Sequence, residues 1–318
     1  MRIGRAAGVT DTGLQRLRNE DAFVCEPPLF AVADGMGGAR AGEVAARLAA
    51  AALEEPGRAA RDSDDLVGLI AEANRRIWER SLADPLTAGM GTTMTVALVA
   101  PESGKVTIGH VGDSRAYLLR DGAIEQLTTD HSLVAELVQG GMLTPEEAER
   151  HPQRSAITRA LGTEPDVDVD AFTIEVVPGD LVLLCSDGLS TMVADERVAS
   201  VVEDAGRDPA RAADALVEAA NAQGGVDNVT VVLFEIVEGE PEASEPGGRA
   251  ASTIEVPSVA AADPGRGGAP GTDGHDEETP ADPVSTHGAG KGGRLPALLL
   301  VLGVLVLGTL VLYWGISR

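Results

Sequence analysis

The sequence has few cysteines and few basic side chains for its length. Its 318 residues include two cysteines, Cys25 and Cys185, and both stand beside apolar runs. We therefore expect buried, reduced thiols and no disulfide scaffold. Lysine and arginine together number 25, against 50 aspartate and glutamate residues, so the formal net charge is −25. Because binding to nucleic acid depends on basic patches, this balance argues against nucleic acid as a partner.

Two familiar kinds of segment are also missing. Residues 1–5 (MRIGR) form no apolar stretch, so we expect no secretory signal. The segment 34–38 (DGMGG) follows an apolar run, as a phosphate-cradling loop would, but it has neither the lysine and serine/threonine pair of a P-loop nor the GxGxxG pattern. Its three glycines still allow the backbone to approach a ligand or an ion closely.

Composition divides the chain into three parts. Residues 1–237 have the mixed composition of one globular domain with a substantial core. Residues 238–290 are rich in Glu, Asp, Pro, Gly, Ala and Ser and have almost no large apolar side chains. We expect a disordered acidic linker there, with a reach of roughly 40 Å as a flexible coil. Residues 291–318 contain an uncharged apolar stretch from about 295 to 316.

The apolar stretch predicts a transmembrane anchor. At about 1.5 Å per residue, it is long enough to cross a hydrocarbon core of about 30 Å. Tyr313 and Trp314 lie at one end, where aromatic side chains favour the membrane interface. Lys291 and Arg294 precede the stretch, and Arg318 follows it. The positive-inside bias then predicts a single-pass protein of the cell (inner) membrane whose N-terminal domain faces the cytoplasm.

The first 237 residues show mixed strand and helix patterns. Alternating apolar and polar residues predict strands over 93–99, 105–111 and 115–119, and Asp121-Gly122 predicts a tight hairpin turn. Helical spacing predicts helices over 41–53, 64–81, 195–204 and 209–221. The expected N-caps are Asp64, Asp195 and Asp208. Strands mixed with helix pairs, without regular βαβ alternation, indicate an α+β layered fold.

Five short motifs are spread along this domain. They are 16–21 (RLRNED), 34–38 (DGMGG), 112–115 (GDSR), 186–188 (SDG) and 225–228 (GVDN). Asp34 and Asp187 come just after apolar runs, so each carboxylate is expected to point out of the end of a sheet. Several such strand ends that converge would form an oxygen-lined site, which suits Mg²⁺ or Mn²⁺. Paired hard cations of this kind are a common means of hydrolysing phosphate esters.

In their order and spacing, the five motifs resemble those of the metal-dependent protein phosphatases, the protein phosphatase 2C type, in the bacterial branch of that family. The resemblance runs over roughly residues 7–237. It implies a four-layer α-β-β-α sandwich of two antiparallel sheets flanked by helices, with the active site in a cleft at one end of the sheets. It also implies a protein-serine/threonine phosphatase that uses two Mn²⁺ or Mg²⁺ ions.

The resemblance assigns the two-metal centre to four residues. Asp34 resembles the carboxylate that bridges the two metal ions. The backbone carbonyl of Gly35 would complete the shell of the second ion. Asp187 and Asp227 resemble the other ligands of the first ion.

The resemblance also implies a third metal site and three catalytic side chains. Asp113, together with Asp187 and the carbonyl of Ser155, resembles the third site of bacterial members. Glu20 and Asp21 match the acidic pair that holds metal-bound waters. Arg16 matches the arginine that binds the substrate phosphate, because a guanidinium fork suits two phosphate oxygens.

The implied chemistry is direct hydrolysis. Two cations bridged by a water would lower its pKa, and the resulting hydroxide would attack phosphorus while the cations and Arg16 neutralise the phosphate oxygens. The Cys-x5-Arg loop of tyrosine phosphatases is absent. Many eukaryotic members carry a histidine where this chain has Met36, so our hypothesis is that metal-bound water protonates the leaving seryl or threonyl oxygen. We expect His110 and His131 to be structural.

We expect the substrates to be proteins phosphorylated by bacterial serine/threonine kinases. Membrane kinases themselves are included, because the predicted anchor confines the domain to the membrane surface. A second interpretation is a catalytically silent phosphatase-like scaffold that binds phosphoproteins at the membrane. Its signature would be loss of ligand carboxylates, and all the expected ones are present. A third is a phosphatase for an anti-sigma-factor antagonist, but such relatives usually add a sensor domain and lack some motifs, which this sequence does not.

Overall fold

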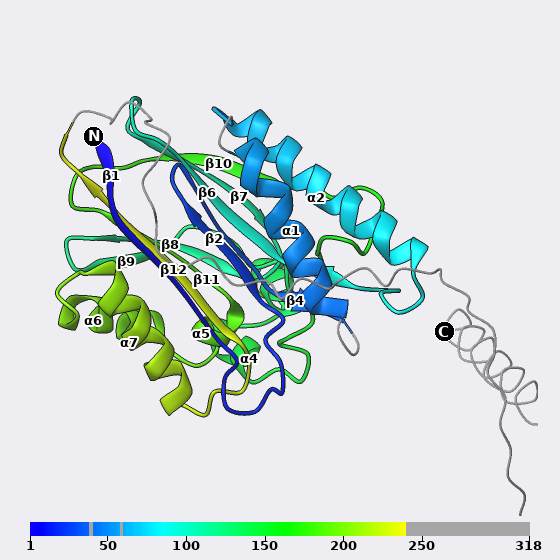
Figure 1. Ribbon diagram of the computed structural model, residues 1–318. Helices are drawn as coiled ribbons and strands as arrows, with labels where there is room; N and C mark the ends of the chain where they lie inside the picture. Colours follow the sequence, from blue (N-terminus) through cyan, green and yellow to red (C-terminus); the bar gives the residue numbers. More distant parts are fainter. Residues whose placement is uncertain (38–40, 58–59, 240–318) are drawn as a thin grey trace, which may run out of the picture. The chain divides into compact units, whose positions relative to one another are not determined.

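The computed structural model describes residues 1–37, 41–57 and 60–239 (Figure 1). The predicted membrane anchor 291–318 lies outside these residues, and so does the predicted linker 238–290 except for its first two positions. Among the described residues, none of the helices combines the length and the apolar character that a membrane crossing requires. The anchor therefore remains a prediction from the sequence.

Two five-stranded antiparallel sheets form the centre of the domain. The first contains, in spatial order, β1 (Arg2–Asp11), β12 (Val229–Val237), β11 (Leu181–Cys185), β8 (Arg115–Arg120) and β9 (Ala123–Gln126). The second contains β10 (Asp170–Glu175), β7 (Lys105–Val111), β6 (Met94–Ala100), β3 (Leu29–Ala33) and β2 (Ala22–Glu26). A short ladder joins β4 (Gly35–Met36) to β5 (Gly91–Thr92).

Helix pairs cover the outer faces of the sheets. On the second sheet lie α1 (Ala41–Gly57) and α2 (Ser63–Ala83), and on the first lie α6 (Asp195–Asp204) and α7 (Pro209–Ala222). Figure 1 shows the two pairs on opposite sides of the sheets. Three short helices complete the described elements: α3 (Leu133–Gln139), α4 (Pro145–Glu149) and α5 (Asp187–Ser190). The predicted α-β-β-α sandwich is confirmed.

The central strands are apolar on both faces because each face meets another layer. In β12, Val231 and Leu233 pack toward the helices, whereas Val232 and Phe234 pack toward the other sheet. This alternation follows from the two-residue period of a strand. The rings of Phe30 and Phe234 stack across the two sheets, with centroids 4.1 Å apart and planes 12° apart.

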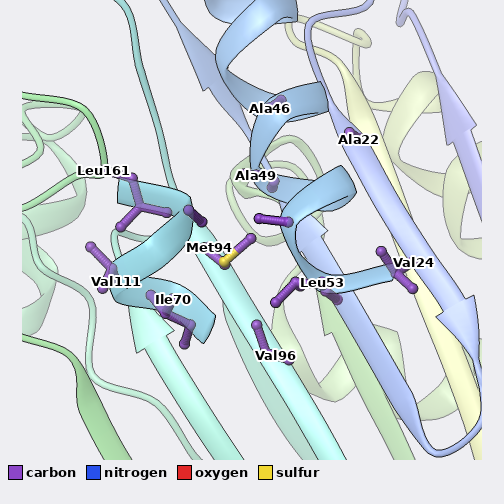
Figure 2. Packing of buried hydrophobic residues seen from close by; sticks show 14 of the residues in the cluster. Ala22, Val24, Ala46, Ala49, Leu53, Ile70, Met94, Val96, Val111 and Leu161 are labelled. Atoms are coloured by element: carbon purple, nitrogen blue, oxygen red, sulfur yellow. The ribbon is translucent and has the colours of Figure 1, made fainter. Parts of the chain in front are cut away.

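A second apolar layer lies between α1, α2 and the second sheet. Figure 2 shows Leu53 of α1 and Ile70 of α2 beside Met94 and Val96 of β6. All four side chains are fully buried. Burial on this scale contributes roughly 1.5–3 kcal/mol for each large apolar side chain. These layers fix the strands, and therefore the positions at which the strands end.

The predicted strands and helices agree with the structure to within a few residues at their ends. The strands over 93–99, 105–111 and 115–119 are β6, β7 and β8, and the helices are α1, α2, α6 and α7. The predicted hairpin turn joins β8 to β9, with Asp121 at φ 52° and Gly122 at φ 78°, as a turn of type I′ requires. Cys25 is half-buried rather than buried, Cys185 is buried, and both are free thiols.

Two of the three predicted N-caps were wrong. The side chain of Asp62, not Asp64, accepts the N–H of Asp65 at the start of α2. Asp195 is the first residue of α6 rather than its cap, and its carboxylate accepts the hydroxyl of Tyr117 (3.0 Å) instead. Only Asp208 caps as predicted, by accepting the N–H of Arg211 (3.0 Å).

Candidate metal centre

Five of the predicted carboxylates lie at the same end of the two sheets. Asp34 follows β3, Asp113 comes soon after β7, and Asp187 begins α5 just beyond β11. Asp21 immediately precedes β2, and Asp227 comes shortly before β12. Because antiparallel neighbours place the start of one strand beside the end of the next, these positions meet at one edge. We call these five residues the carboxylate cluster.

The backbone of Asp34 is fixed by two threonines, Thr92 at the end of β5 and Thr93 just before β6. Its N–H donates to Thr93 Oγ1 (2.9 Å), and its carbonyl accepts the N–H of Thr93 (2.9 Å) and the hydroxyl of Thr92 (2.8 Å). The side chain takes no part in these bonds. The carboxylate is therefore held at the strand end, where it interacts with the side chain of Asp187.

Asp21 is held from the first sheet. Its Oδ2 accepts the hydroxyl of Thr230 on β12 (2.6 Å). The backbone of this segment is fixed by Asn19, whose side chain accepts the N–H of Asp21 (3.1 Å) and donates to Thr10 (2.7 Å). One oxygen of Asp21 is thus used for positioning, and the other is buried without a hydrogen-bond partner.

Asn228 ties the loop of residues 12–20 to the start of β12. Its Nδ2 donates to the carbonyls of Thr12 (2.9 Å) and Arg18 (2.8 Å), and its Oδ1 accepts the N–H of Glu20 (2.8 Å). Asn228 is buried. These side-chain bonds all go to the backbone of the segment that carries Arg16, Glu20 and Asp21, so this side chain determines where that segment lies.

Gly35 occupies a position with no room for a side chain. A Cβ there would lie 2.2 Å from the carbonyl oxygen of Gly42 and 2.4 Å from that of Glu20. A Cβ on Gly42 would in turn lie 2.6 Å from the carbonyl oxygen of Gly35. The backbones of β4, of the start of α1 and of the Glu20 segment therefore meet directly, as the glycines in 34–38 suggested.

The cluster is an unfavourable place for so many negative charges. Burial raises the pKa of Asp34 well above its usual range, and the charges of neighbouring carboxylates, Asp21 first, raise it further. Burial is also the main cause that raises the pKa of Asp21 and of Asp113 to about 7 each. The pKa of Asp187 is raised by burial and by the charge of Asp227. Positive charge is what such a cluster requires.

The unpaired oxygens of the cluster fit hard cations. Among the described residues, buried carboxylate oxygens without a hydrogen-bond partner are Asp21 Oδ1, Asp113 Oδ1 and Asp187 Oδ1. Buried polar atoms are rarely left unpaired in proteins, and carboxylate oxygens are the ligands that Mg²⁺ and Mn²⁺ prefer. In the part of the chain that the structure describes, no three Asp, Glu, His or Cys side chains are already arranged to hold an ion. The ligand set therefore stays a prediction.

Arg16 contacts the cluster through Asp227. Its Nη2 donates to Asp227 Oδ2 (2.7 Å), and half of the arginine side chain remains exposed. The other oxygen of Asp227 accepts the N–H of Asn228 (2.8 Å). A guanidinium has five N–H donors, and this ion pair uses one of them. The remaining donors can bind an oxyanion above the carboxylates.

His131 holds the turn that carries Asp113. Its Nδ1 accepts the N–H of Gly112 (3.0 Å), and its own backbone N–H donates to the carbonyl of Gly112 (2.7 Å). Because Nδ1 accepts, the proton of the neutral ring lies on Nε2, which faces Asp170 (3.2 Å) and Arg159 (3.0 Å). Burial lowers the pKa of His131 and favours this neutral form. The expected structural role is confirmed.

His110 is also structural, and Ser155 lies apart. His110 is fully buried in β7, where its Nδ1 contacts Thr95 Oγ1 (2.9 Å) and its Nε2 donates to the carbonyl of Thr129 (3.1 Å). Ser155 is exposed beyond α4. The structure shows no contact that brings Ser155 to Asp113, so its part in a third metal site also stays a prediction.

The sequence analysis missed the residues that position the cluster. Asn228 stood in one of the motifs, but its pairing with Thr12 and Arg18 could not be inferred because more than 200 residues separate them in sequence. Thr230 and Thr93 looked like ordinary strand residues. The only available signal was a polar side chain in an otherwise apolar strand, which usually marks a buried hydrogen bond.

Comparisons with known proteins show which proteins this chain resembles. The family model described as protein phosphatase 2C matches residues 15–221. The serine/threonine protein phosphatase PstP of Mycobacterium tuberculosis is 43% identical over 243 residues, which make up 74% of this chain but 45% of PstP. This chain thus spans less than half of that relative. The serine/threonine phosphatase Stp of Listeria monocytogenes is 40% identical over 238 residues, 71% of this chain and 93% of Stp.

A solved structure supports the same relationship. The catalytic domain of the serine/threonine protein phosphatase PstP, in complex with two manganese ions, superposes with a TM-score of 0.68 at 39% identity. The superposition covers 74% of this chain and 99% of that domain. The layers described above are therefore those of a fold that holds two metal ions in that protein.

Proposed function

Because this chain belongs to the protein phosphatase 2C family, we propose that it hydrolyses phosphoserine and phosphothreonine in proteins with the help of two Mn²⁺ or Mg²⁺ ions. The observation that carries the proposal is the carboxylate cluster, with three unpaired buried oxygens and Arg16 at its edge. The manganese ions in the PstP domain support the choice of metal.

The cluster offers ligands for both ions. Asp34 would bridge them, the carbonyl of Gly35 would bind one, and Asp187 and Asp227 would bind the other. Divalent cations in such a site supply Lewis acidity and allow a water to ionise near neutral pH. A third ion, if bound, would take Asp113, with Asp187 and the carbonyl of Ser155.

The side chains around the ions would hold water and substrate. Glu20 and Asp21 are half-buried acceptors at the cluster, where they can orient water by hydrogen bonds. Arg16 can keep its bond to Asp227 and still direct further N–H groups at two phosphate oxygens. An ion pair to the half-buried carboxylate of Asp227 restricts the guanidinium before the substrate arrives, which favours binding in one orientation.

The proton for the leaving oxygen would come from water in the site. Both nitrogens of His131 and of His110 face other partners, so neither ring is placed to donate to substrate. A general acid acts only while it is protonated, so it would give the pH–rate profile a limb that falls at high pH; this basic limb should therefore stay unchanged in His131→Gln once activity is corrected for folded fraction. Loss of that limb in the variant would show that His131 is the acid.

The location and the partners are further proposals from the sequence. The apolar stretch 295–316 would anchor the chain in the cell membrane with the domain in the cytoplasm, where phosphorylated proteins and membrane serine/threonine kinases would be its substrates. Deletion of 291–318 should then raise substrate phosphorylation in cells. Unchanged phosphorylation would contradict the anchor's role. The silent scaffold is disfavoured because the carboxylates of the cluster are all present.

Hydrolysis of a phosphothreonine peptide by the full chain tests the activity. We expect turnover with Mn²⁺ or Mg²⁺, none with EDTA, and a loss of about a hundredfold or more in Asp187→Asn. Asp121→Asn is the matched control, because it changes an Asp-Gly pair of the same kind in a hairpin turn where asparagine tolerates the positive φ. Absence of turnover with any metal from a folded chain would favour the scaffold.

A further inference from the structure

Large apolar side chains are exposed beside the carboxylate cluster. In the described residues, Leu14 is 68% exposed, Leu17 is 99% exposed and Val226 is 45% exposed. Leu14 and Leu17 lie on either side of Arg16 in sequence, and Val226 immediately precedes Asp227, the partner of Arg16. We call Leu14, Leu17 and Val226 the apolar rim.

Leu14 and Val226 come from two loops that lie side by side. The N–H of Leu14 donates to the carbonyl of Gly225 (2.8 Å). A Cβ on Gly225 would lie 2.9 Å from Leu14 Cγ, so the leucine side chain lies against the residue next to Val226. The ion pair of Arg16 and Asp227 joins the same two loops a second time (2.7 Å).

The loop that carries Leu14 and Leu17 is also anchored at both ends. Asn228 bonds to the carbonyls of Thr12 (2.9 Å) and Arg18 (2.8 Å), on either side of the two leucines. Hydrogen bonds of this kind hold the loop while the leucine side chains stay in solvent. Exposed apolar side chains that gather on an anchored loop usually mark a binding surface.

We propose that the apolar rim binds apolar side chains that flank the phosphorylated residue of a protein substrate. This inference rests on the proposed function, because it takes Arg16 as the group that binds the phosphate. A phosphate on Arg16 brings the neighbouring residues of the peptide close to Leu17, the next residue in the chain, and to Val226, which precedes the partner of Arg16. The rim therefore contributes to substrate choice next to the reacting phosphate.

Charge disfavours substrates with acidic flanks. The chain has a formal net charge of −25, so acidic residues beside the phosphate would be repelled. Apolar residues meet no such penalty, and they remove the exposed leucines from water when they bind. The rim thus distinguishes apolar from polar flanks, which the metal ions and Arg16 alone cannot do.

The test compares two phosphothreonine peptides on the full chain with Mn²⁺. One has leucine at both positions that flank the phosphothreonine, and the other has serine there. We expect kcat/KM to be about three- to tenfold higher for the leucine peptide. Leu17→Ser should bring the ratio of the two peptides to within about twofold. Leu86→Ser is the matched control, because Leu86 is 85% exposed beyond α2, and it should keep the ratio of the unchanged chain.

The outcomes separate this inference from the proposed function. Hydrolysis of p-nitrophenyl phosphate, which has no flanking residues, reports on the metal centre alone. If the chain cleaves it but treats both peptides equally, the rim proposal is wrong and the phosphatase remains. If the chain cleaves neither p-nitrophenyl phosphate nor the peptides, the proposed function fails. In that case, equal Kd values of the two peptides by calorimetry would overturn the rim proposal as well. The proposal would also be overturned if the chain sediments as a dimer while Leu17→Ser sediments as a monomer with an unchanged ratio of kcat/KM for the two peptides. The rim would then be a contact between two copies of the chain.

Discussion

Replacement of Asn228 by alanine should separate the positioning of the site from the stability of the fold. The change removes two donors and one acceptor, which leaves the carbonyls of Thr12 and Arg18 and the N–H of Glu20 without their partner. At about 0.5–1.5 kcal/mol for each net hydrogen bond, the three together predict a loss of about 2–4 kcal/mol in the free energy of unfolding. For a domain of this size, Tm should fall by roughly 5–15 °C.

Asn74 is a close structural match for Asn228 and serves as its control. It is equally buried, its Nδ2 donates to the carbonyls of Glu164 and Pro165 (3.1 Å each), and its Oδ1 accepts the N–H of Gly162 (2.7 Å). Asn74→Ala should therefore lose a similar free energy. It leaves the loop that carries Arg16 untouched, whereas Asn228→Ala releases that loop.

The assay is urea unfolding together with peptide hydrolysis, at a temperature where both variants stay folded. Since a displacement of about 1 Å can cost a hundredfold in rate, kcat/KM per folded molecule should fall about tenfold or more in Asn228→Ala. Asn74→Ala should stay within about threefold of the unchanged chain. Equal losses of activity in the two variants would refute the idea that Asn228 acts by placing Arg16.

Three other predictions follow from single contacts. The buried ring of His110 has a pKa lowered to about 4 from 6.5, mainly by burial. Between these two pH values the unfolded chain therefore binds more protons than the folded chain. The free energy of unfolding should fall by up to about 3 kcal/mol as pH drops from about 6.5 to 4. Urea unfolding at several pH values should show a smaller dependence of this free energy on pH in His110→Gln. Gly35→Ala should abolish hydrolysis because the added Cβ would lie 2.2 Å from a carbonyl oxygen. Gly68→Ala is the control: Gly68 is exposed in α2 with open space around it, so alanine there should raise the free energy of unfolding by about 0.5–1 kcal/mol. Mn²⁺ at a hundred times its Kd should raise the free energy of unfolding, measured by calorimetry, by about 2.7 kcal/mol. Asp187→Asn should lose most of this stabilisation. An equal stabilisation of the variant would contradict the role of Asp187 as a metal ligand.

Most of the fold could be predicted because apolar patterning repeats the layer structure. The alternating segments became β6, β7 and β8, and the Ala-rich segments became helices. The first residues of the helices were harder to predict, because several residues that can act as N-caps follow one another at the start of α2. Asp62, Ser63 and Asp64 all carry a side-chain acceptor, and only the extended backbone at Asp62 decides which one caps. Sequence alone does not give that backbone conformation.

The candidate site divides in the same way. Its charged residues were recognisable because five motifs stand in an order that resembles a known family, although each motif taken singly is weak. The residues that hold them were not, since a threonine such as Thr230 is also a common strand former. Its contact with Asp21 joins positions 209 residues apart and depends on the pairing of β1 with β12. Such long-range partners become visible only when the strand order is known.

The strand ends explain why positioning residues and ligands are different kinds of residue. Strands buried on both faces exclude charge, so carboxylates can enter only where a strand begins or ends. At those ends, neutral groups such as Thr93 and Asn228 bind the backbone, and the outer carboxylate oxygens stay unpaired. Loss of a neutral group therefore costs both stability and activity. Loss of a carboxylate removes a charge that the neighbouring carboxylates repel, so it costs activity while the metal-free fold keeps its stability or gains some.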